Sequence, residues 1–173
     1  YDRALAIAPD NAQAHFGRAL ALRDLHRFEE ATASYRRAIA LAPDYVEAHN
    51  NLGVLLSQQG RAAEAIGHFQ RAVEANPKYA QALVNLGLTL ASQNKFKEAR
   101  EPIRSAMALQ PDDARTLTLL AMIETRAGNA KEAVPLFQKV AALQPADAGA
   151  RINLGIAQAD AYDLPGALKA FTE

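Results

Sequence analysis

Five prolines stand at a constant interval of 34 residues along the 173-residue chain, at Pro9, Pro43, Pro77, Pro111 and Pro145. A constant period of this length indicates one supersecondary unit that is copied along the chain, with each copy packing on its neighbours. The period therefore predicts a stack of repeated units with a continuous core. Such a stack presents a long surface to partners rather than an active-site pocket.

Aligning the units on these prolines reveals columns of small and large residues. The alanine column is Ala31, Ala65, Ala99, Ala133 and Ala167, and the large apolar column four residues later is Tyr35, Phe69, Ile103, Phe137 and Phe171, with Tyr1 in the same register. A leucine column of Leu52, Leu86, Leu120 and Leu154 has Arg18 as its exception and precedes Gly53, Gly87 and Gly155. Small residues where two helices cross allow a close approach, so these columns predict tightly paired helices.

Apolar residues recur at helical spacing within each unit, and turn signals fall at two places. One turn lies near Gly60, Asn94 and Gly128, where a left-handed residue can end a helix, and the other lies at the periodic prolines. We expect first helices near 12–25, 46–59, 80–93, 114–127 and 148–161, and second helices near 28–41, 62–75, 96–109, 130–143 and from 164 onward. Pro102 and Pro135 fall inside second helices, where we expect mild kinks.

The second full unit, with Leu52-Gly53, Ala65, Phe69, Ala72 and Pro77, resembles the tetratricopeptide repeat. The resemblance covers essentially the whole chain and implies an all-α, right-handed superhelix (an α-solenoid) of antiparallel helix pairs. The implied boundaries are the end of a preceding repeat at 1–11, full repeats at 12–45, 46–79, 80–113 and 114–147, and a partial repeat at 148–173. Both ends fall inside helices, so we expect a window of a longer protein or an array that associates through open ends.

The resemblance also implies that the first helices line the concave side of the superhelix. The candidate peptide-binding residues there are Asn51, Asn85, Asn153, Asn50, Phe16, Leu20, Val54, Val84, Leu88 and Met122. An asparagine amide both donates and accepts, so a column of them can pair with the backbone of an extended peptide. This column, which Leu119 interrupts, is similar to the ladder in the repeat arm of O-linked N-acetylglucosamine transferases. The alternative is that the asparagines bond only between helices and that the apolar column packs between neighbouring first helices.

Charge and residue types exclude several other classes of function. Lys plus Arg and Asp plus Glu both number 19 and form no block of like charge, so nucleic acid is not an expected partner. No apolar run has the length of a membrane-spanning helix, and membrane insertion is not expected. The chain has no cysteine, no nucleophile motif and no glycine-rich phosphate loop, so we expect neither an enzyme nor a cofactor.

The histidines raise the question of a metal site. His15 and His49 share a column, but neither has a second ligand at helical spacing on its own helix. We therefore expect a packing or capping role for them, no metal, and surface positions for His26 and His68.

These observations favour a protein–protein interaction scaffold that binds a peptide segment of a partner in the concave groove. A tail clamp for heat-shock chaperones is not expected, because apolar residues such as Phe16 and Leu20 stand where such repeats carry Lys and Arg. The alternatives are a substrate-docking arm of a larger enzyme, such as a glycosyltransferase, and a structural array that self-associates end to end.

Overall fold

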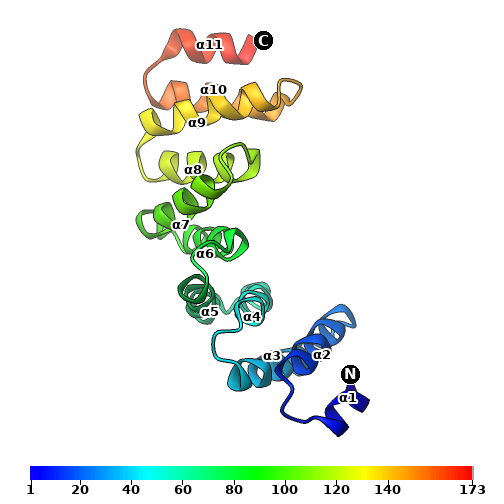
Figure 1. The fold of residues 1–173 in the computed structure, drawn as a ribbon. Coiled ribbons are helices and arrows are strands. Elements are labelled where there is room, and N and C mark those ends of the chain that lie inside the picture. The colour runs from blue at the N-terminus through cyan, green and yellow to red at the C-terminus, as the bar shows by residue number, and fades with distance from the viewer. Residues whose placement is uncertain (173) are drawn as a thin grey trace. The chain divides into compact units, whose positions relative to one another are not determined.

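The computed structural model describes residues 1–172, apart from the side chains of Asp2 and Ala4, and is helical from one end to the other (Figure 1). The helices are α1 (Asp2–Ile7), α2 (Ala12–Asp24), α3 (Phe28–Leu41), α4 (Val46–Gln58), α5 (Ala62–Ala75), α6 (Ala80–Ser92), α7 (Phe96–Leu109), α8 (Ala114–Arg126), α9 (Ala130–Leu143), α10 (Ala148–Asp160) and α11 (Leu164–Thr172). Within the described residues there is no strand, and the all-α fold class is confirmed. The second helices start and stop as expected, and each first helix ends one residue earlier than expected.

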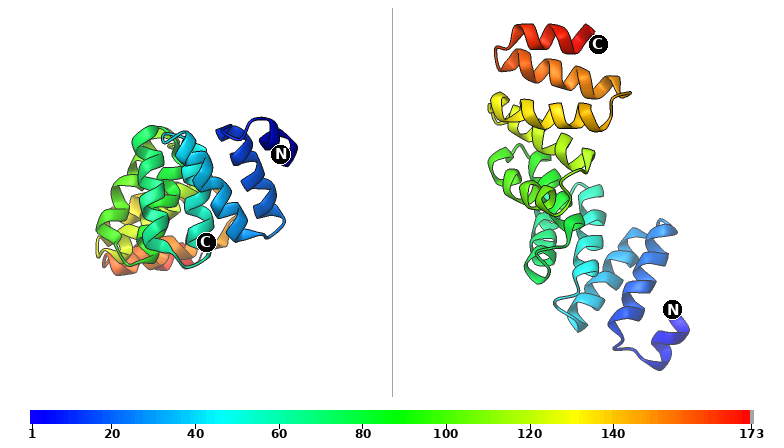
Figure 2. Two further views of the ribbon diagram at one scale, coloured as in Figure 1. Left: turned by 90° about the horizontal axis from the view of Figure 1, so that it is seen from below. Right: turned by 45° about the horizontal axis from the view of Figure 1, so that its top comes forward.

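The chain divides into two compact units, one from Tyr1 to Thr89 and the other beginning at Leu90, and the division falls within α6. In the first unit, α2 packs along α3, α4 packs along α5, and α3 contacts α4. In the second unit, α8 packs along α9 and α10 along α11, while α7 contacts α8 and α9 contacts α10 (Figures 1 and 2). Each unit is therefore a stack in which a helix touches its neighbours in the sequence, as expected for helical repeats.

The small and large columns form the core of the helix pairs. Ala31, Ala65, Ala99 and Ala133 are fully buried, and so are Tyr35, Phe69 and Ile103 in the large apolar column. A Cβ atom added to Gly53 would lie 2.7 Å from Cε1 of Phe69, and one added to Gly155 would lie 2.5 Å from Cε1 of Phe171. The glycines of α4 and α10 are thus the positions on which the aromatic rings of α5 and α11 rest.

A residue in the left-handed conformation lies in the turn between the two helices of every repeat. Gly60, Asn94 and Gly128 have φ values of 77°, 58° and 84°, which confirms the turn expected at these positions. The same register holds His26 and Tyr162, with φ values of 57° and 64°. An L residue pays a steric penalty in this region, so the turn is imposed on these two positions by the helix pairs around them.

The prolines inside second helices do not interrupt them. α7 continues through Pro102 and α9 through Pro135. The next core residues, Ile103 and Phe137 (two residues beyond Pro135), are buried, so packing holds each helix in place across the hydrogen bond that proline cannot form. The kinks expected at these prolines stay predictions.

A buried carboxylate replaces the leucine of one column. Leu22, Leu56 and Leu90 are followed in register by Glu124, whose side chain is only 1% exposed. Arg100 of α7 donates to its Oε2 at 2.8 Å, Arg104 donates to its Oε1 at 3.0 Å, and Asn129 donates to its Oε2 at 2.8 Å. In the second unit, α8 is therefore joined to α7 by charge and hydrogen bonds at a position where the first three full repeats carry leucine.

No helix among residues 1–172 combines the length and the apolar character needed to span a membrane.

Candidate functional site

The apolar column of the first helices is exposed from the third full repeat onward. In the first unit Leu20 and Val54 are half-buried, as is Val84 in the neighbouring register, whereas Leu88 is 52% exposed. In the second unit Met122 and Ile156 are 46% and 47% exposed. We call the registers of Leu88, Met122 and Ile156, together with the asparagine column, the first-helix face of each unit.

The asparagines of the first unit are engaged inside the protein. Asn51 Oδ1 accepts a hydrogen bond of 3.2 Å from Arg23 of α2, and its Nδ2 donates to the carbonyl of Glu47 at 2.8 Å. Asn85 Nδ2 donates to Oδ1 of the buried Asn50 at 2.9 Å, which joins α6 to α4. Three of these amides therefore connect one first helix to the preceding one. A peptide that binds these amides has to compete with the bonds that they already make.

Phe16 lies among aromatic rings. Its centroid is 5.9 Å from that of Tyr35 in α3 and 5.0 Å from that of Tyr45, the residue before α4. Phe16 and Leu20 also line a groove of about 410 Å³ with Tyr1 and Gly17, at the α1 end of the first unit. Phe16 thus contributes both to the packing between repeats and to a surface groove.

The two candidates in the second unit, Met122 and Asn153, line one groove. It lies between α8 and α10, has a volume of about 180 Å³, and is completed by Ile156, Phe137 and Arg126. The side chain of Asn153 makes no hydrogen bond with any described residue, in contrast to Asn51 and Asn85. Arg126 was not among the predicted site residues, although its place one turn beyond Met122 on α8 could have indicated it. Phe137 was predicted as a member of the large apolar column and not as part of this surface.

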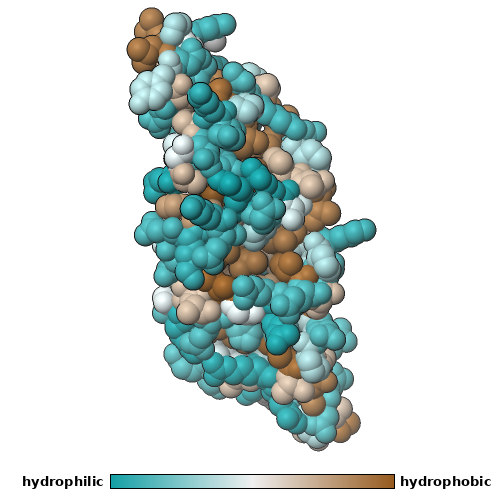
Figure 3. All heavy atoms as spheres, turned by 90° about the vertical axis from the view of Figure 1, so that its left-hand side faces the viewer, coloured by the Kyte–Doolittle hydropathy of each residue, from teal (hydrophilic) through white to brown (hydrophobic). Residues whose placement is uncertain are grey.

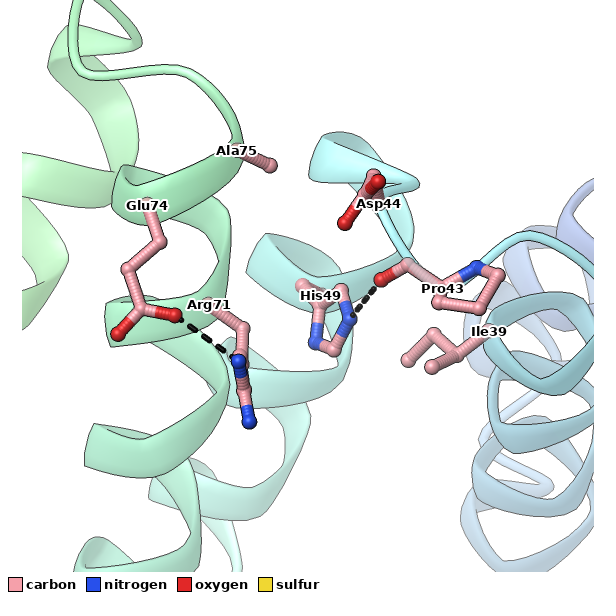
Figure 4. A pocket seen from close by; sticks show the side chains of 7 residues that line it. All are labelled: Ile39, Pro43, Asp44, His49, Arg71, Glu74 and Ala75. Atoms are coloured by element: carbon pink, nitrogen blue, oxygen red, sulfur yellow. Dashed lines mark hydrogen bonds and ion pairs between the residues drawn. The ribbon is translucent and has the colours of Figure 1, made fainter.

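The histidine column caps the turns between repeats. His15 Nε2 is 2.8 Å from the carbonyl oxygen of Pro9, and His49 Nε2 is 2.9 Å from that of Pro43 (Figure 4). Arg151, in the same column, donates to the carbonyl of Pro145. Since a carbonyl only accepts, both histidines donate from Nε2, and the capping role expected for them agrees with these contacts.

His68 is not the surface residue that we expected. It is half-buried against α4, and its Nδ1 lies 3.0 Å from Nδ1 of His49. Because His49 donates from Nε2, its neutral Nδ1 is an acceptor, and His68 must supply the proton of this bond. Burial, followed by the charges of His49 and Arg36 and opposed by Glu64, lowers the pKa of His68 to about 4.

His49 also borders a pocket of about 670 Å³ beside the turn between the first two full units (Figure 4). Arg71 and Glu74 on its other side are paired with each other at 3.1 Å. Within residues 1–172, no three histidine or carboxylate side chains are grouped so that they could hold a metal ion. His49, Arg71 and Glu74 of this pocket are thus already engaged in hydrogen bonds or an ion pair.

Hydrophobic side chains also reach the surface outside the first-helix face. Leu164, Leu168 and Phe171 of α11 are 67%, 67% and 52% exposed. Figure 3 shows hydrophobic atoms at the top of the view, where α11 lies, while hydrophilic side chains cover much of the rest of that side. Leu168 holds the register of Val134, which packs against the core cluster formed by Ala121, Ala133, Phe137 and Ala157 of α8, α9 and α10.

Comparison with known proteins places these repeats in context. A family model described as the tetratricopeptide repeat matches residues 1–45, 18–79, 51–114 and 118–173. No curated protein matches the chain.

Several solved structures have the same fold. YrrB, a tetratricopeptide-repeat protein with an unusual peptide-binding site, is 23% identical, has a TM-score of 0.90, and is matched over 98% of this chain and 87% of that chain. MamA from Desulfovibrio magneticus is 20% identical with a TM-score of 0.83, over 93% of this chain and 91% of that chain. PilF from Pseudomonas aeruginosa is 19% identical with a TM-score of 0.73, over 93% and 75%. At these identities the likeness shows the fold.

Proposed function

Since the chain belongs to the tetratricopeptide-repeat family, we propose that it is a protein-interaction scaffold that binds a peptide segment of a partner on the first-helix face. The observation that carries the proposal is the exposure of Met122 and Ile156, which line one groove of the second unit together with Asn153. In the first unit, Leu88 is exposed in the same sequence register. Large apolar side chains that are exposed together are characteristic of interaction surfaces. YrrB, which has the same fold, has a peptide-binding site.

The asparagines divide into two roles in this proposal. Asn51 and Asn85, with Asn50, hold neighbouring first helices at a fixed spacing through their hydrogen bonds. Asn153 has its donor and its acceptor available, so it can pair with the backbone N–H and C=O groups of an extended peptide. A peptide is then held by apolar contacts with Met122 and Ile156 and by hydrogen bonds between its backbone and Asn153.

A selected peptide tests the location of the surface. Peptides are selected from a displayed random library on the 173-residue chain, and the affinity of one of them is measured by fluorescence anisotropy. Met122→Glu should weaken binding by about tenfold or more, because it removes an apolar contact that a bound peptide covers and places a charge there. Leu143→Glu is the matched control, since Leu143 is a 42% exposed leucine on the second helix α9. Equal affinity for both variants, with unchanged helicity, would place the binding surface elsewhere.

A second candidate function is self-association, which the exposed apolar side chains of α11 favour. If this end pairs with another copy, the mass measured by sedimentation should rise with concentration, and Leu168→Glu should abolish the rise. A chain that stays monomeric at high concentration would exclude this function.

A further inference from the structure

The groove between α8 and α10 is apolar at its base. Phe137 of α9 and Ala157 of α10 are buried there, at 3% and 1% exposure, and Met122 and Ile156 form the two walls. Thr125 also lines the groove, but its hydroxyl donates to the carbonyl of Ala121 at 2.9 Å. A ligand group inside the groove therefore meets hydrocarbon rather than a free hydroxyl.

The size of the groove suits one large apolar side chain. An apolar cavity of about 150 Å³ can hold a benzene ring. The groove, at about 180 Å³, has room for a phenyl or isobutyl group and not for two such groups side by side. Its open side is flanked by Met122 and Ile156, so a side chain can enter from a peptide that lies across the two helices.

The charge at the rim has one sign. Arg126, in the last turn of α8, lines the groove and forms no ion pair with a described residue. No acidic residue lines the groove. Glu124, which is near Arg126 in the sequence, is buried and already paired with Arg100 and Arg104. Asp160 of α10 holds the same register as Arg126 but forms no ion pair with Arg126. The rim therefore attracts a carboxylate of a ligand.

From this groove we infer the chemistry of the peptide: its anchor is a large apolar residue, and the residue beside the anchor is aspartate or glutamate. The apolar side chain fills the space between Met122 and Ile156, the carboxylate pairs with Arg126, and Asn153 binds the peptide backbone. This inference rests on the proposed function and adds the sequence preference of one subsite. Arg126 has a competing role, because a cation in the last turn of a helix also stabilises the helix dipole.

Reversing the charge of Arg126 tests the sequence preference for an acidic peptide residue separately from the stability of the protein. A random 12-residue library is displayed with its C-terminus fused to the coat protein, so that an acidic preference reports side chains and not a free carboxylate. It is selected separately on the wild type, Arg126→Glu, Ile156→Glu and Leu143→Glu, and the selected pools are sequenced. The wild type and Leu143→Glu should enrich an apolar residue next to an acidic one. Arg126→Glu should keep the apolar preference and replace the acidic preference by lysine or arginine.

Binding of one wild-type peptide then gives magnitudes. Exposed ion pairs contribute little, so Arg126→Glu should weaken binding by about two- to fivefold beyond any effect on folding. Ile156→Glu should weaken it by about tenfold or more. A pool whose acidic preference survives Arg126→Glu would overturn the inference.

The two proposals fail in different ways. If peptides are enriched and lost in Ile156→Glu but show no preference for an acid, the inference falls and the proposed function stands. If enrichment is the same in Ile156→Glu as in the wild type, the proposed function falls. If the wild type instead dimerises through this face, so that its concentration-dependent mass is abolished by Ile156→Glu, the occupant is a second copy and the inference is also overturned.

Discussion

The histidine pair of α4 and α5 should make the chain lose stability in mild acid. His68 donates to His49, and His49 donates to the carbonyl of Pro43 (Figure 4). Burial lowers the pKa of His68 to about 4, whereas an unfolded histidine titrates near 6.5. Below about pH 6.5 the unfolded chain therefore binds a proton that the folded chain does not, so stability is complete above this pH and falls as the pH drops toward 4.

The size of the effect follows from the two pKa values. Linkage between a pKa of about 4 in the folded chain and about 6.5 in the unfolded chain gives a loss of about 2.6 kcal/mol at pH 4.5. His68 is only half-buried, and solvent screens part of the interaction, so we expect about 1–2 kcal/mol. The free energy of unfolding of His68→Gln should lack this component, because the glutamine amide can still donate to His49 but carries no titrating group.

Urea denaturation at pH 7.5, 6.5, 5.5 and 4.5 measures the difference between the wild type and His68→Gln. The matched control is His15→Gln, which replaces another histidine that is bonded to a turn carbonyl, that of Pro9, but keeps the histidine pair. The control should retain the pH dependence of the wild type. A difference between the wild type and His68→Gln that is constant from pH 7.5 to 4.5, or a His68 imidazole that titrates near pH 6.5 by NMR, would refute the reasoning.

Three further substitutions test the packing and the turns. Glu124→Ala should destabilise the chain by about 2–4 kcal/mol in urea denaturation, because the guanidinium of Arg100, which is 25% exposed, loses its partner and a cavity is left at the buried position. Glu124→Leu loses the same partner but fills the space with the residue of the column, so it should cost less, and equal losses would contradict this account. Tyr162→Gly should raise the melting temperature measured by circular dichroism by about 1–4 °C, because it relieves the backbone strain of an L residue in the left-handed conformation. The side chain of Tyr162 is 92% exposed, so little contact is lost. A fall in melting temperature would show that its φ of 64° carries no strain. Asn51→Ala should lower the free energy of unfolding by about 0.5–1.5 kcal/mol, because the hydrogen bond from Arg23 is lost. The affinity for a selected peptide should not change. Lost affinity at unchanged stability would show that Asn51 binds the peptide.

Periodicity carried most of the fold prediction. Helix bounds to within one residue, the paired architecture and the left-handed turns at Gly60 and Gly128 follow from patterns within one 34-residue repeat, and the structure confirms them. These features are local, because helical spacing, proline and glycine act on a few residues at a time. The burial of Ala65 and Phe69 was predictable for the same reason, since alanine and a large apolar residue recur at these two positions in every repeat.

The sequence alone therefore determined the repeat, its helices and its core columns, while the tertiary structure decided which side chains are available to a ligand. Asn51 and Asn153 occupy one column, yet the first is bound by Arg23 and the second makes no hydrogen bond with a described residue. His68 was expected on the surface, yet it donates to His49 across the helix pair. Such differences depend on residues that do not repeat and that meet only when the helices pack, so no period in the sequence contains them.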